Sequence, residues 1–293
     1  MLREMANTIG VFAASGPFEP DRFEAGLARL RLAGATVRLA PGLQAREGYL
    51  AGPDAARLAG LEALLEDPEV DGLLAVRGGY GITRILDALD PRAFERANKP
   101  IAGFSDVTAL HQWLLLRNLP CIHAPVLTQL GQLPVMTAQL TLEALEGAQR
   151  PLAADPGPAL IGGVAEGRLW GGNLVLLSAL AGTPAGRPPP GPSLLLLEEV
   201  GESTYRVDRL LTQLRSAGML EGVVGIALGD FWKCRPAQPH HWELDTVLAD
   251  RLGDLGIPVR GGFPVGHGRR NEPVWLGRSY RLDADAGILE PIE

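Results

Sequence analysis

The segment IAGFSDVTALH, residues 101–111, contains Ser105, whose hydroxyl group is the best candidate in the chain for a chemical role. A short apolar strand is expected to end near Gly103, and a helix is expected to begin near Asp106. Ser105 therefore stands at a sharp strand-to-helix turn, which presents its side chain at the top of a sheet. Two interpretations are open, because Ser105 could cap the helix or act as a nucleophile. The usual nucleophile turn has glycine two residues after the serine, where this chain has Val107.

A developing oxyanion next to Ser105 would find backbone N–H donors from two segments. The start of the helix supplies free N–H groups. The apolar segment GLLAVR (72–77) runs into GGYG, and Gly78 and Gly79 allow a second backbone to approach closely and donate another N–H. Ligands of open α/β sheets bind outside the carboxyl ends of the strands, so both segments end where a site is expected.

A serine nucleophile needs a base, and the chain has five histidines. His267 is the favoured candidate, because it stands between two glycines in the loop GGFPVGHGRRNEP and has little to pack against. His123, at the end of the strand-like CIHAPV, is the second candidate. His111 is expected to pack against a neighbour or face solvent. The pair His240–His241, with Glu243 nearby, matches no zinc motif and predicts a solvated loop, so we expect no metal and no cofactor.

The base in turn needs an orienting acid, and the segment LLLLEEVGES offers two. Glu198 and Glu199 stand where a buried strand of four leucines would end. In the simpler interpretation, both carboxylates mark the exit of the strand into solvent. In the other, one of them accepts from Nδ1–H of His267 and fixes its tautomer. The order serine, glutamate, histidine is the order used by α/β hydrolases.

The elements that must position these residues alternate between strand and helix in the first half of the chain. Strands are expected at 8–13, 36–40, 72–77 and 100–104, and helices in the segments between and after them. This alternation predicts an α/β fold with a mostly parallel sheet covered on both faces.

The amino-acid composition changes near residue 150, where GAQRPLAADPGPALIGG is rich in proline, glycine and alanine. We interpret 149–163 as a linker between an N-terminal α/β domain (1–148) that carries Ser105 and a C-terminal β/α domain (164–293) that carries the acid and the base. In the second domain, EGRLWGG, SLLLLEE, GVVGIALGDF and SYRLDADAGILEPIE read as strands, and YRVDRLLTQLRSAG and ELDTVLADRLGDLG as helices.

Composition narrows the class of protein. The chain has 293 residues, of which 46% are apolar, and a net charge of −7. The acidic balance argues against a nucleic-acid partner. No apolar run approaches the length of a membrane span, and no secretory signal is visible at the start. The two cysteines, Cys121 and Cys234, suggest no disulfide framework. We therefore expect a soluble, cytoplasmic, globular protein without membrane or nucleic-acid partners.

Five segments, spread over nearly the whole chain, carry a family resemblance. They are VRGGYG, GFSDVTALH, LWGGNL, LLLEEVGESTYRVDRLL and GFPVGHG. In this order the chain resembles the LD-carboxypeptidases, which are serine peptidases and have the microcin C immunity peptidases among their relatives. The resemblance implies an N-terminal domain like the class I glutamine amidotransferases, a C-terminal domain of the swivelling β/α type, and a homodimer.

The same resemblance assigns roles to residues of this chain. It implies a triad of Ser105, Glu198 and His267, which favours Glu198 over Glu199 as the acid. It also implies an oxyanion hole made of the backbone N–H groups of Asp106 and Gly79. One departure is Ala124 in CIHAPV, where many members have glycine, and it affects the expected shape of that loop but not the triad.

The activity implied by the resemblance is removal of the terminal D-alanine from murein tetrapeptide at an L–D bond. The alternatives are a microcin immunity type of peptidase, which cleaves a peptidyl-nucleotide amide, and a non-catalytic ligand-binding α/β protein. A carboxypeptidase must recognise a free carboxylate, for which Arg77 is a candidate, although a structural ion pair would explain it equally well. Trp170 and Asn173, in LWGGNL, are candidates for the cleft lining, with core packing the alternative for Trp170.

Overall fold

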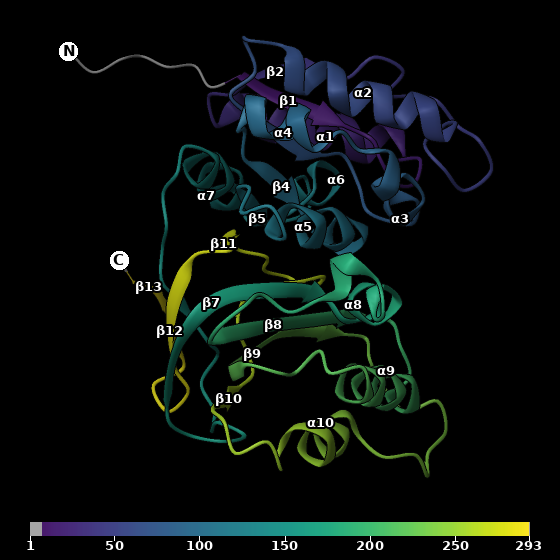
Figure 1. The fold of residues 1–293 in the computed structure, drawn as a ribbon. Helices are drawn as coiled ribbons and strands as arrows, with labels where there is room; N and C mark the ends of the chain where they lie inside the picture. Colours follow the sequence, from purple (N-terminus) through teal and green to yellow (C-terminus); the bar gives the residue numbers. More distant parts are fainter. Residues whose placement is uncertain (1–7, 293) are drawn as a thin grey trace. The chain divides into compact units, whose positions relative to one another are not determined.

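The computed structural model describes residues 8–292, and its contacts divide the chain into two compact units. Unit 1 contains the residues up to 148 together with 272–275, and unit 2 contains 149–271 together with the residues from 276 onward. Figure 1 shows the sheets and helices of both units. Each unit combines a sheet with helices, so the predicted α/β class is confirmed.

Unit 1 is built on a six-stranded sheet in the order β11-β5-β4-β3-β1-β2. The register pairs β2, β1, β3, β4 and β5 in parallel, each with its neighbour in that order, as the alternation of strand and helix predicts. The strands are β1 (Thr8–Phe12), β2 (Thr36–Leu39), β3 (Gly72–Ala75), β4 (Ile101–Gly103), β5 (Cys121–His123) and β11 (Val274–Leu276).

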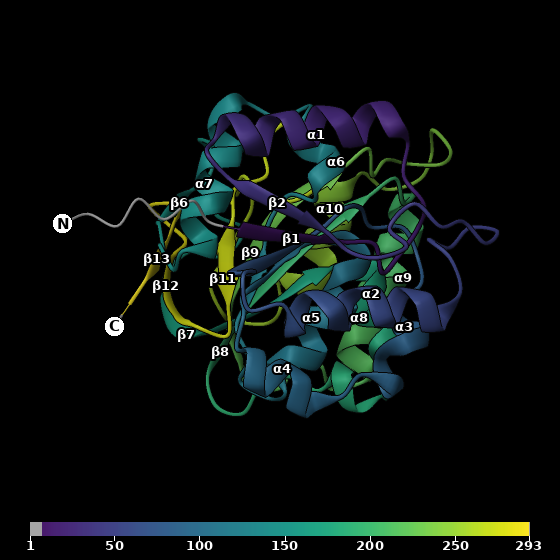
Figure 2. The same ribbon diagram turned by 90° about the horizontal axis from the view of Figure 1, so that it is seen from above.

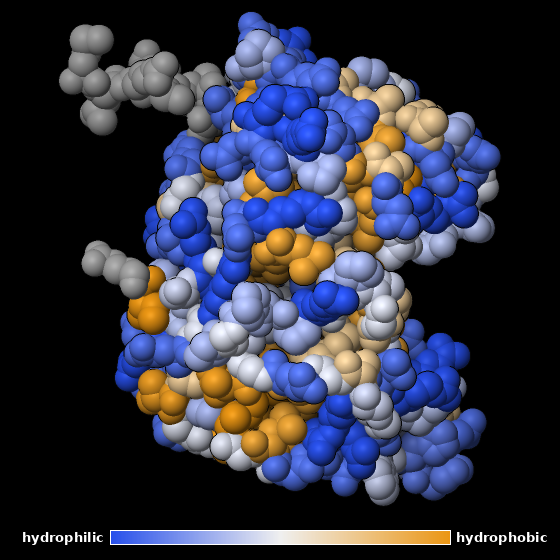
Figure 3. All heavy atoms as spheres, viewed as in Figure 1, coloured by the Kyte–Doolittle hydropathy of each residue, from blue (hydrophilic) through white to orange (hydrophobic). Residues whose placement is uncertain are grey.

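Helices cover both faces of the unit 1 sheet, which is why β3, β4 and β5 are buried along their whole length. Figure 2 shows α1 and α7 on one side of β1 and β2, and α2 and α4 on the other. On the face of unit 1 drawn in Figure 3, most of the helix surface is hydrophilic. The helices are α1 (Pro20–Leu32), α2 (Asp54–Glu66), α3 (Ile82–Ile85), α4 (Pro91–Ala97), α5 (Thr108–Leu115), α6 (Leu127–Leu130) and α7 (Val135–Leu145).

Unit 2 is built on a seven-stranded mixed sheet in the order β10-β9-β8-β7-β12-β13-β6. The strands β10, β9, β8 and β7 run parallel, and β12, β13 and β6 continue the sheet antiparallel. The strands are β6 (Leu152–Ala153), β7 (Val164–Asn173), β8 (Ser193–Val200), β9 (Val223–Trp232), β10 (Val259–Arg260), β12 (Ser279–Asp283) and β13 (Ile288–Pro291); the helices are α8 (Leu174–Leu180), α9 (Thr204–Ser216) and α10 (Leu244–Leu252).

Residues 149–163, interpreted from composition as a linker, are hydrogen-bonded into unit 2. The short strand β6 pairs with β13, and the guanidinium of Arg260 donates to the carbonyl oxygen of Asp155 (2.6 Å). The carbonyl and amide of Ile161 both bond to Val259. The segment is therefore part of unit 2, and its prolines and glycines lie in a largely irregular backbone that packs on that unit. The domain boundaries drawn from the sequence stay a prediction.

Candidate active site

Ser105 lies in a tight turn between β4 and α5, in unit 1. Its φ is 63°, in the left-handed region that non-glycine residues rarely adopt. Such a conformation costs about 1–3 kcal/mol and is found mainly where the surroundings enforce it, often at active sites. Ser105 is also partly exposed within a run of buried residues. A helix cap needs no such strain, so this geometry favours the nucleophile interpretation.

Val107 packs against the glycine that precedes the serine. A Cβ added at Gly103 would lie 2.9 Å from the methyl groups of Val107. The usual nucleophile turn has one glycine two residues before the serine and one two residues after it. This turn keeps the first glycine and has Val107 in place of the second.

The glycine loop after β3 lies directly against Ser105. A Cβ added at Gly78 would meet both Cβ and Oγ of Ser105 at 2.7 Å, and the backbone N of Asp106 at 3.4 Å. The loop is held in place because Gly16 N donates to Gly78 O (3.2 Å). Gly79 has a φ of 117°, which glycine adopts without strain. The backbone of this loop can therefore approach an atom bound at Ser105.

The Asp106 side chain ties the serine turn to the glycine loop. Asp106 is buried, and its Oδ2 accepts from the backbone N of Ile82 (3.0 Å), the first residue of α3. Burial raises the pKa of this carboxyl above its usual range. The Asp106 side chain thus has a structural role that the sequence did not reveal, and the oxyanion role of its backbone N–H stays a prediction.

Glu198 and His267 meet in unit 2. The Nδ1 of His267 lies 2.6 Å from Oε2 of Glu198. Glu198 is 0% exposed, and the His267 side chain keeps a small exposed fraction. Because a carboxylate only accepts hydrogen bonds, Nδ1 carries the proton, and Nε2 is left as the nitrogen that can take another. This is the arrangement that a general base needs.

A β-bulge accompanies Glu198. The register of β8 against β9 shifts between Leu197 and Glu199, so that Glu198 stands opposite two residues of β9, Gly229 and Asp230. Bulges re-aim side chains and are frequent next to active sites. On its other side Glu198 is in register with Asn173 of β7.

The two glycines beside His267 make room for carboxylates. A Cβ at Gly266 would lie 3.0 Å from Oε2 of Glu198, and one at Gly268 would lie 2.0 Å from Oδ2 of Asp230. The loop is fixed because Gly266 N donates to Oδ1 of Asn271 (3.0 Å). The backbone of Gly268 also bonds to Asp230, whose pKa is raised by burial. Asp230 and Asn271 were not predicted, and only the glycines around the histidine hinted at them.

Glu199 points to a different set of partners. It is buried and accepts from the backbone N of Val175 (2.8 Å) and Val200 (2.8 Å), and from Nδ2 of Asn173 (3.2 Å). Burial raises the pKa of Glu199 to about 7. Glu199 therefore joins the end of β8 to the start of α8, whereas Glu198 contacts the histidine. Neither carboxylate simply marks an exit into solvent.

The remaining histidines lie elsewhere. His111 is fully buried in α5, where burial lowers its pKa to about 3. His123 is fully buried at the end of β5, with its ring edge-on to Phe104 at 5.6 Å. Within residues 8–292, no three His, Cys, Asp or Glu side chains form a group that could hold a metal ion. Nor is any helix in that range long and apolar enough to cross a membrane.

The three candidates for substrate binding have different environments. Trp170 is buried, and its Nε1 donates to Oγ of Ser193 (3.2 Å), which favours the packing interpretation. Asn173 is buried and caps α8 by accepting from Leu176 N (3.2 Å).

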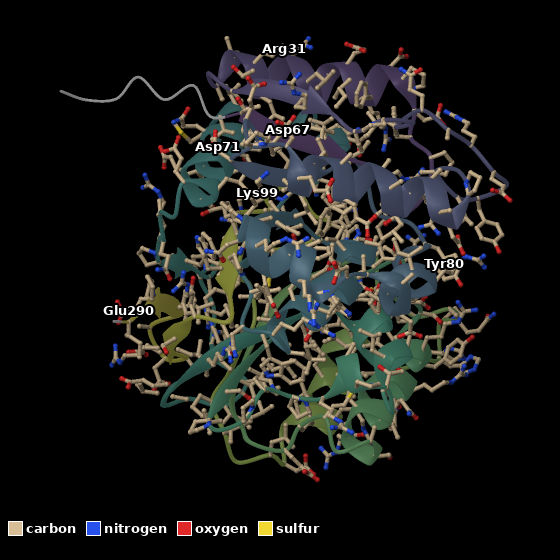
Figure 4. The ribbon with its side chains drawn as sticks, turned by 45° about the horizontal axis from the view of Figure 1, so that its top comes forward. Arg31, Asp67, Asp71, Tyr80, Lys99 and Glu290 are labelled. Carbon is tan, nitrogen blue, oxygen red and sulfur yellow. The ribbon has the colours of Figure 1, made fainter. Side chains whose placement is uncertain are left out.

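Arg77 is exposed, and its Nη1 donates to the carbonyl of Pro17. No ion pair of Arg77 is found with any residue between 8 and 292. It lines a cavity of about 500 Å³ in unit 1, together with Gly16, Pro17, Tyr49, Gly79 and Tyr80. Tyr80 lies at the edge of unit 1 in Figure 4.

Comparison with known proteins identifies the family. Residues 9–124 match the LD-carboxypeptidase N-terminal domain and residues 166–282 match the LD-carboxypeptidase C-terminal domain. A putative carboxypeptidase of Streptomyces coelicolor is 42% identical over 96% of this chain and 92% of its own. The murein tetrapeptide carboxypeptidase of Pseudomonas aeruginosa is 32% identical over 94% of this chain and 93% of its own.

A solved structure supports the same conclusion. The muramoyltetrapeptide carboxypeptidase from Oxalobacter formigenes has a TM-score of 0.86 and 26% identity, with 97% of each chain covered. Both domain matches, the relatives and the fold agree with the resemblance seen in the sequence. This chain belongs to the LD-carboxypeptidase family of peptidases.

Proposed function

We propose that this chain is a serine carboxypeptidase that releases the terminal D-alanine of murein tetrapeptide by hydrolysing an L–D bond. The observation that supports it most is the pair formed by buried Glu198 and partly exposed His267, at 2.6 Å. The strained conformation of Ser105 supports the nucleophile role. Relatives named for murein peptides support the substrate class.

In the proposed first step, Oγ of Ser105 attacks the carbonyl carbon of the scissile amide while Nε2 of His267 takes the hydroxyl proton. Glu198 holds Nδ1–H and stabilises the imidazolium that forms. The N–H groups of Asp106 and Gly79 donate to the oxyanion. His267 then returns the proton to the leaving nitrogen, D-alanine departs, and an acyl ester remains on Ser105.

The second step is hydrolysis of that ester. Nε2 of His267 takes a proton from a water molecule, which attacks the ester carbonyl under the same backbone donors. Collapse of the intermediate returns the proton to Oγ of Ser105 and releases the shortened peptide. The proposal needs no metal or cofactor.

Arg77 is the proposed partner of the terminal carboxylate of the substrate. Its guanidinium is exposed, is oriented by Pro17, and lines the same cavity as Gly79. Two N–H groups of a guanidinium can bind a carboxylate in parallel. Amidation of the substrate terminus should therefore reduce turnover, and Arg77→Lys should raise KM more than it lowers kcat.

The deciding experiment is incubation of the protein with murein tetrapeptide, with detection of tripeptide and D-alanine by mass spectrometry. A fluorophosphonate should label Ser105 covalently, and the adduct can be located by peptide mapping. Full activity is expected in EDTA. Loss of activity in EDTA with recovery on zinc addition, or an adduct on another residue, would contradict the proposal.

We further propose that the enzyme is a cytoplasmic homodimer, as the resemblance to the family suggests. Sedimentation equilibrium should give twice the mass of the 31.1 kDa chain. Cell fractionation should find the protein with cytoplasmic markers. A monomeric mass over the micromolar range would contradict the dimer.

A further inference from the structure

Two tyrosines form an exposed aromatic wall in the unit 1 cavity that Arg77 and Gly79 line. Tyr49 and Tyr80 belong to the lining of this cavity, and they are 68% and 46% exposed. Ligand pockets are lined mainly by apolar and aromatic side chains, with a few polar groups that fix the orientation of the ligand. The two tyrosines therefore offer an apolar surface that a ligand in the cavity can reach.

The spacing of the two rings decides how a ligand can lie on them. Their centres are 5.8 Å apart, with 53° between the ring planes. A flat group sandwiched between two rings needs about 7–8 Å between their centres, because carbon atoms pack about 3.5–4 Å apart. The rings of Tyr49 and Tyr80 instead contact each other, as tilted aromatic pairs do. They form one joint surface, which an alkyl or aryl group can cover from the cavity.

Tyr49 is held at the tip of a tight turn. Glu47 N donates to Leu50 O (3.0 Å), and Leu50 N donates to Glu47 O (2.9 Å), so Gly48 and Tyr49 are the two central residues of the turn. Gly48 has a φ of 57°, the positive value that a type II′ turn needs at its first central position. The buried side chain of Leu50 anchors the turn in unit 1. The exposed ring therefore stands on a fixed backbone, which lowers the cost of ordering it around a ligand.

Tyr80 is placed by the loop that carries Gly79, which it follows directly in the sequence. On the α3 side, Arg84 donates to Asp54 of α2, from Nε to Oδ1 (3.0 Å) and from Nη2 to Oδ2 (2.8 Å). Asp54 raises the pKa of Arg84 above its ordinary value, and Tyr80 adds a smaller contribution. Tyr80 thus stands between a glycine proposed to bind the oxyanion and a guanidinium that is fixed by α2.

Charge and shape together define the class of ligand. The exposed guanidinium of Arg77 lines the same cavity and can bind a carboxylate through two N–H groups. Cations are disfavoured beside Arg77. The rings of Tyr49 and Tyr80 favour an apolar group, and a single methyl group would cover only a small part of them. The lining therefore fits a carboxylate that carries a large alkyl or aryl side chain.

We propose that Tyr49 and Tyr80 bind the side chain of the carboxy-terminal residue of the substrate, and that this residue can be a large apolar D-amino acid as well as D-alanine. Its carboxylate pairs with Arg77 while its side chain lies across the two rings. The inference rests on the proposed function, which assigns the terminal carboxylate to Arg77. The bond broken and the proton transfers at His267 are unchanged, because the leaving group is still the amine of an amino acid.

The binding test uses 3-phenylpropanoate as the probe, because it combines a carboxylate with an aryl group and cannot be hydrolysed. Isothermal titration calorimetry with the wild-type protein should give a Kd about tenfold lower for this probe than for propanoate, since the aryl group covers the tyrosine rings. Binding of 3-phenylpropanamide should be much weaker, because the neutral amide cannot pair with Arg77.

Variants separate the ring from the rest of the cavity. Tyr49→Ala should bind 3-phenylpropanoate as weakly as propanoate, whereas Tyr49→Phe, which keeps the ring, should bind as wild type does. Tyr205→Ala is the matched control, because Tyr205 is 42% exposed and lies outside this cavity. It should bind both acids as wild type does, and circular dichroism checks that each variant is folded.

Several outcomes would overturn the proposal. They are equal binding of 3-phenylpropanoate and propanoate to the wild type, unchanged binding in Tyr49→Ala, and equal binding of the acid and the amide. These readouts need no catalysis. If the probe binds as expected but D-alanine is not released from murein tetrapeptide, the proposed reaction fails and the ligand class of the cavity stands. If D-alanine is released but the probe binds no better than propanoate, only the present inference fails.

Hydrolysis measures the effect on substrate choice. With wild-type enzyme, KM for a murein tetrapeptide that ends in D-phenylalanine should be about tenfold below KM for the one that ends in D-alanine. In Tyr49→Ala the two KM values should be equal, and in Tyr205→Ala the difference should be kept. Wild-type enzyme that hydrolyses the D-alanine peptide but not the D-phenylalanine peptide would contradict the wider substrate range.

Discussion

At the amino edge of the unit 1 sheet, Lys99 donates to the carbonyl oxygens of Leu65 (2.8 Å) and Asp67 (2.5 Å) at the end of α2, and Asp71 accepts from Thr8 N (2.9 Å). At the carboxyl edge, Ser105 is held in a left-handed conformation and Arg77 is exposed without an ionic partner between residues 8 and 292. Figure 4 shows Lys99, Asp67 and Asp71 on one side of unit 1 and Tyr80 on the other.

The two edges of the unit 1 sheet therefore have different roles, one in stability and the other in ligand binding. Contacts at the amino edge satisfy helix carbonyls and strand ends, and so contribute to the free energy of unfolding. The carboxyl edge keeps the strained conformation of Ser105, which lowers stability, and the exposed guanidinium of Arg77, and both suit ligand binding. Substitutions at the two edges should therefore separate activity from stability.

The largest effect is expected at the nucleophile. Ser105→Ala and Ser105→Gly should both lower kcat by about 10⁶-fold. Since glycine adopts a φ of 63° without strain, Ser105→Gly should be more stable than Ser105→Ala by about 1 kcal/mol. Kinetics and thermal unfolding measure the two effects. Equal activity of Ser105→Ala and wild type would contradict the proposed mechanism. Equal stability of Ser105→Ala and Ser105→Gly would contradict the inference that residue 105 is strained.

The next effect concerns the neighbouring carboxylates at the carboxyl edge of unit 2. Glu198→Gln should lower kcat by about 10⁴-fold, because an amide cannot stabilise the imidazolium of His267. Glu199→Gln is the matched control and should be mild, since Glu199 accepts from Asn173, Val175 and Val200 and makes no contact with His267. Steady-state kinetics of both variants decide the assignment. The reverse order of effects would move the acid by one residue.

A smaller loss of activity is expected from the glycine loop. In Gly78→Ala the new Cβ would lie 2.7 Å from Oγ of Ser105 and displace either the serine or the loop. Because an oxyanion donor contributes about 10²–10³ in rate, kcat should fall by about that factor. Gly261→Ala is the control, because its Cβ would meet nothing closer than 3.9 Å. Equal kinetics of the two variants would show that the loop does not support catalysis.

The smallest effect on activity is expected at the amino edge. Lys99→Met should leave kcat and KM unchanged while lowering the free energy of unfolding by about 2 kcal/mol, because carbonyls at the end of α2 lose a charged donor. Urea unfolding and kinetics on the same preparation measure both. A change in kcat without a loss of stability would contradict the division between the two edges.

Local signals made much of the fold predictable. Pro20 at the start of α1 and Gly34 just after its end, with a φ of 98°, are residues that begin and end helices. The leucines of β8 are fully buried, as a run of that length predicts. Helices α4, α7 and α8 were not predicted, although Asp90 and Pro91 mark the start of α4 and Asn173 caps α8. The likeness to glutamine amidotransferases and the swivelling type of unit 2 stay predictions.

The sequence predicted only those site residues whose immediate neighbours in the chain are distinctive. A histidine between glycines and a serine at a turn could be read from the sequence. The bulge opposite Glu198 depends on the register of β8 against β9, which no single segment encodes. The burial of Trp170 likewise depends on its partner Ser193, 23 residues away.

The strand β11 has a consequence for how the chain is made. It lies beside β5 at the edge of the unit 1 sheet, and Trp275 donates from Nε1 to the carbonyl of Ala148 (3.0 Å). A ribosome releases residues 121–123 long before 274–276, so in the nascent chain β5 is an open edge that can pair with other chains. Unit 1 is completed only when nearly the whole polypeptide has emerged, and a transcript that ends before codon 274 would encode a protein that cannot cover this edge.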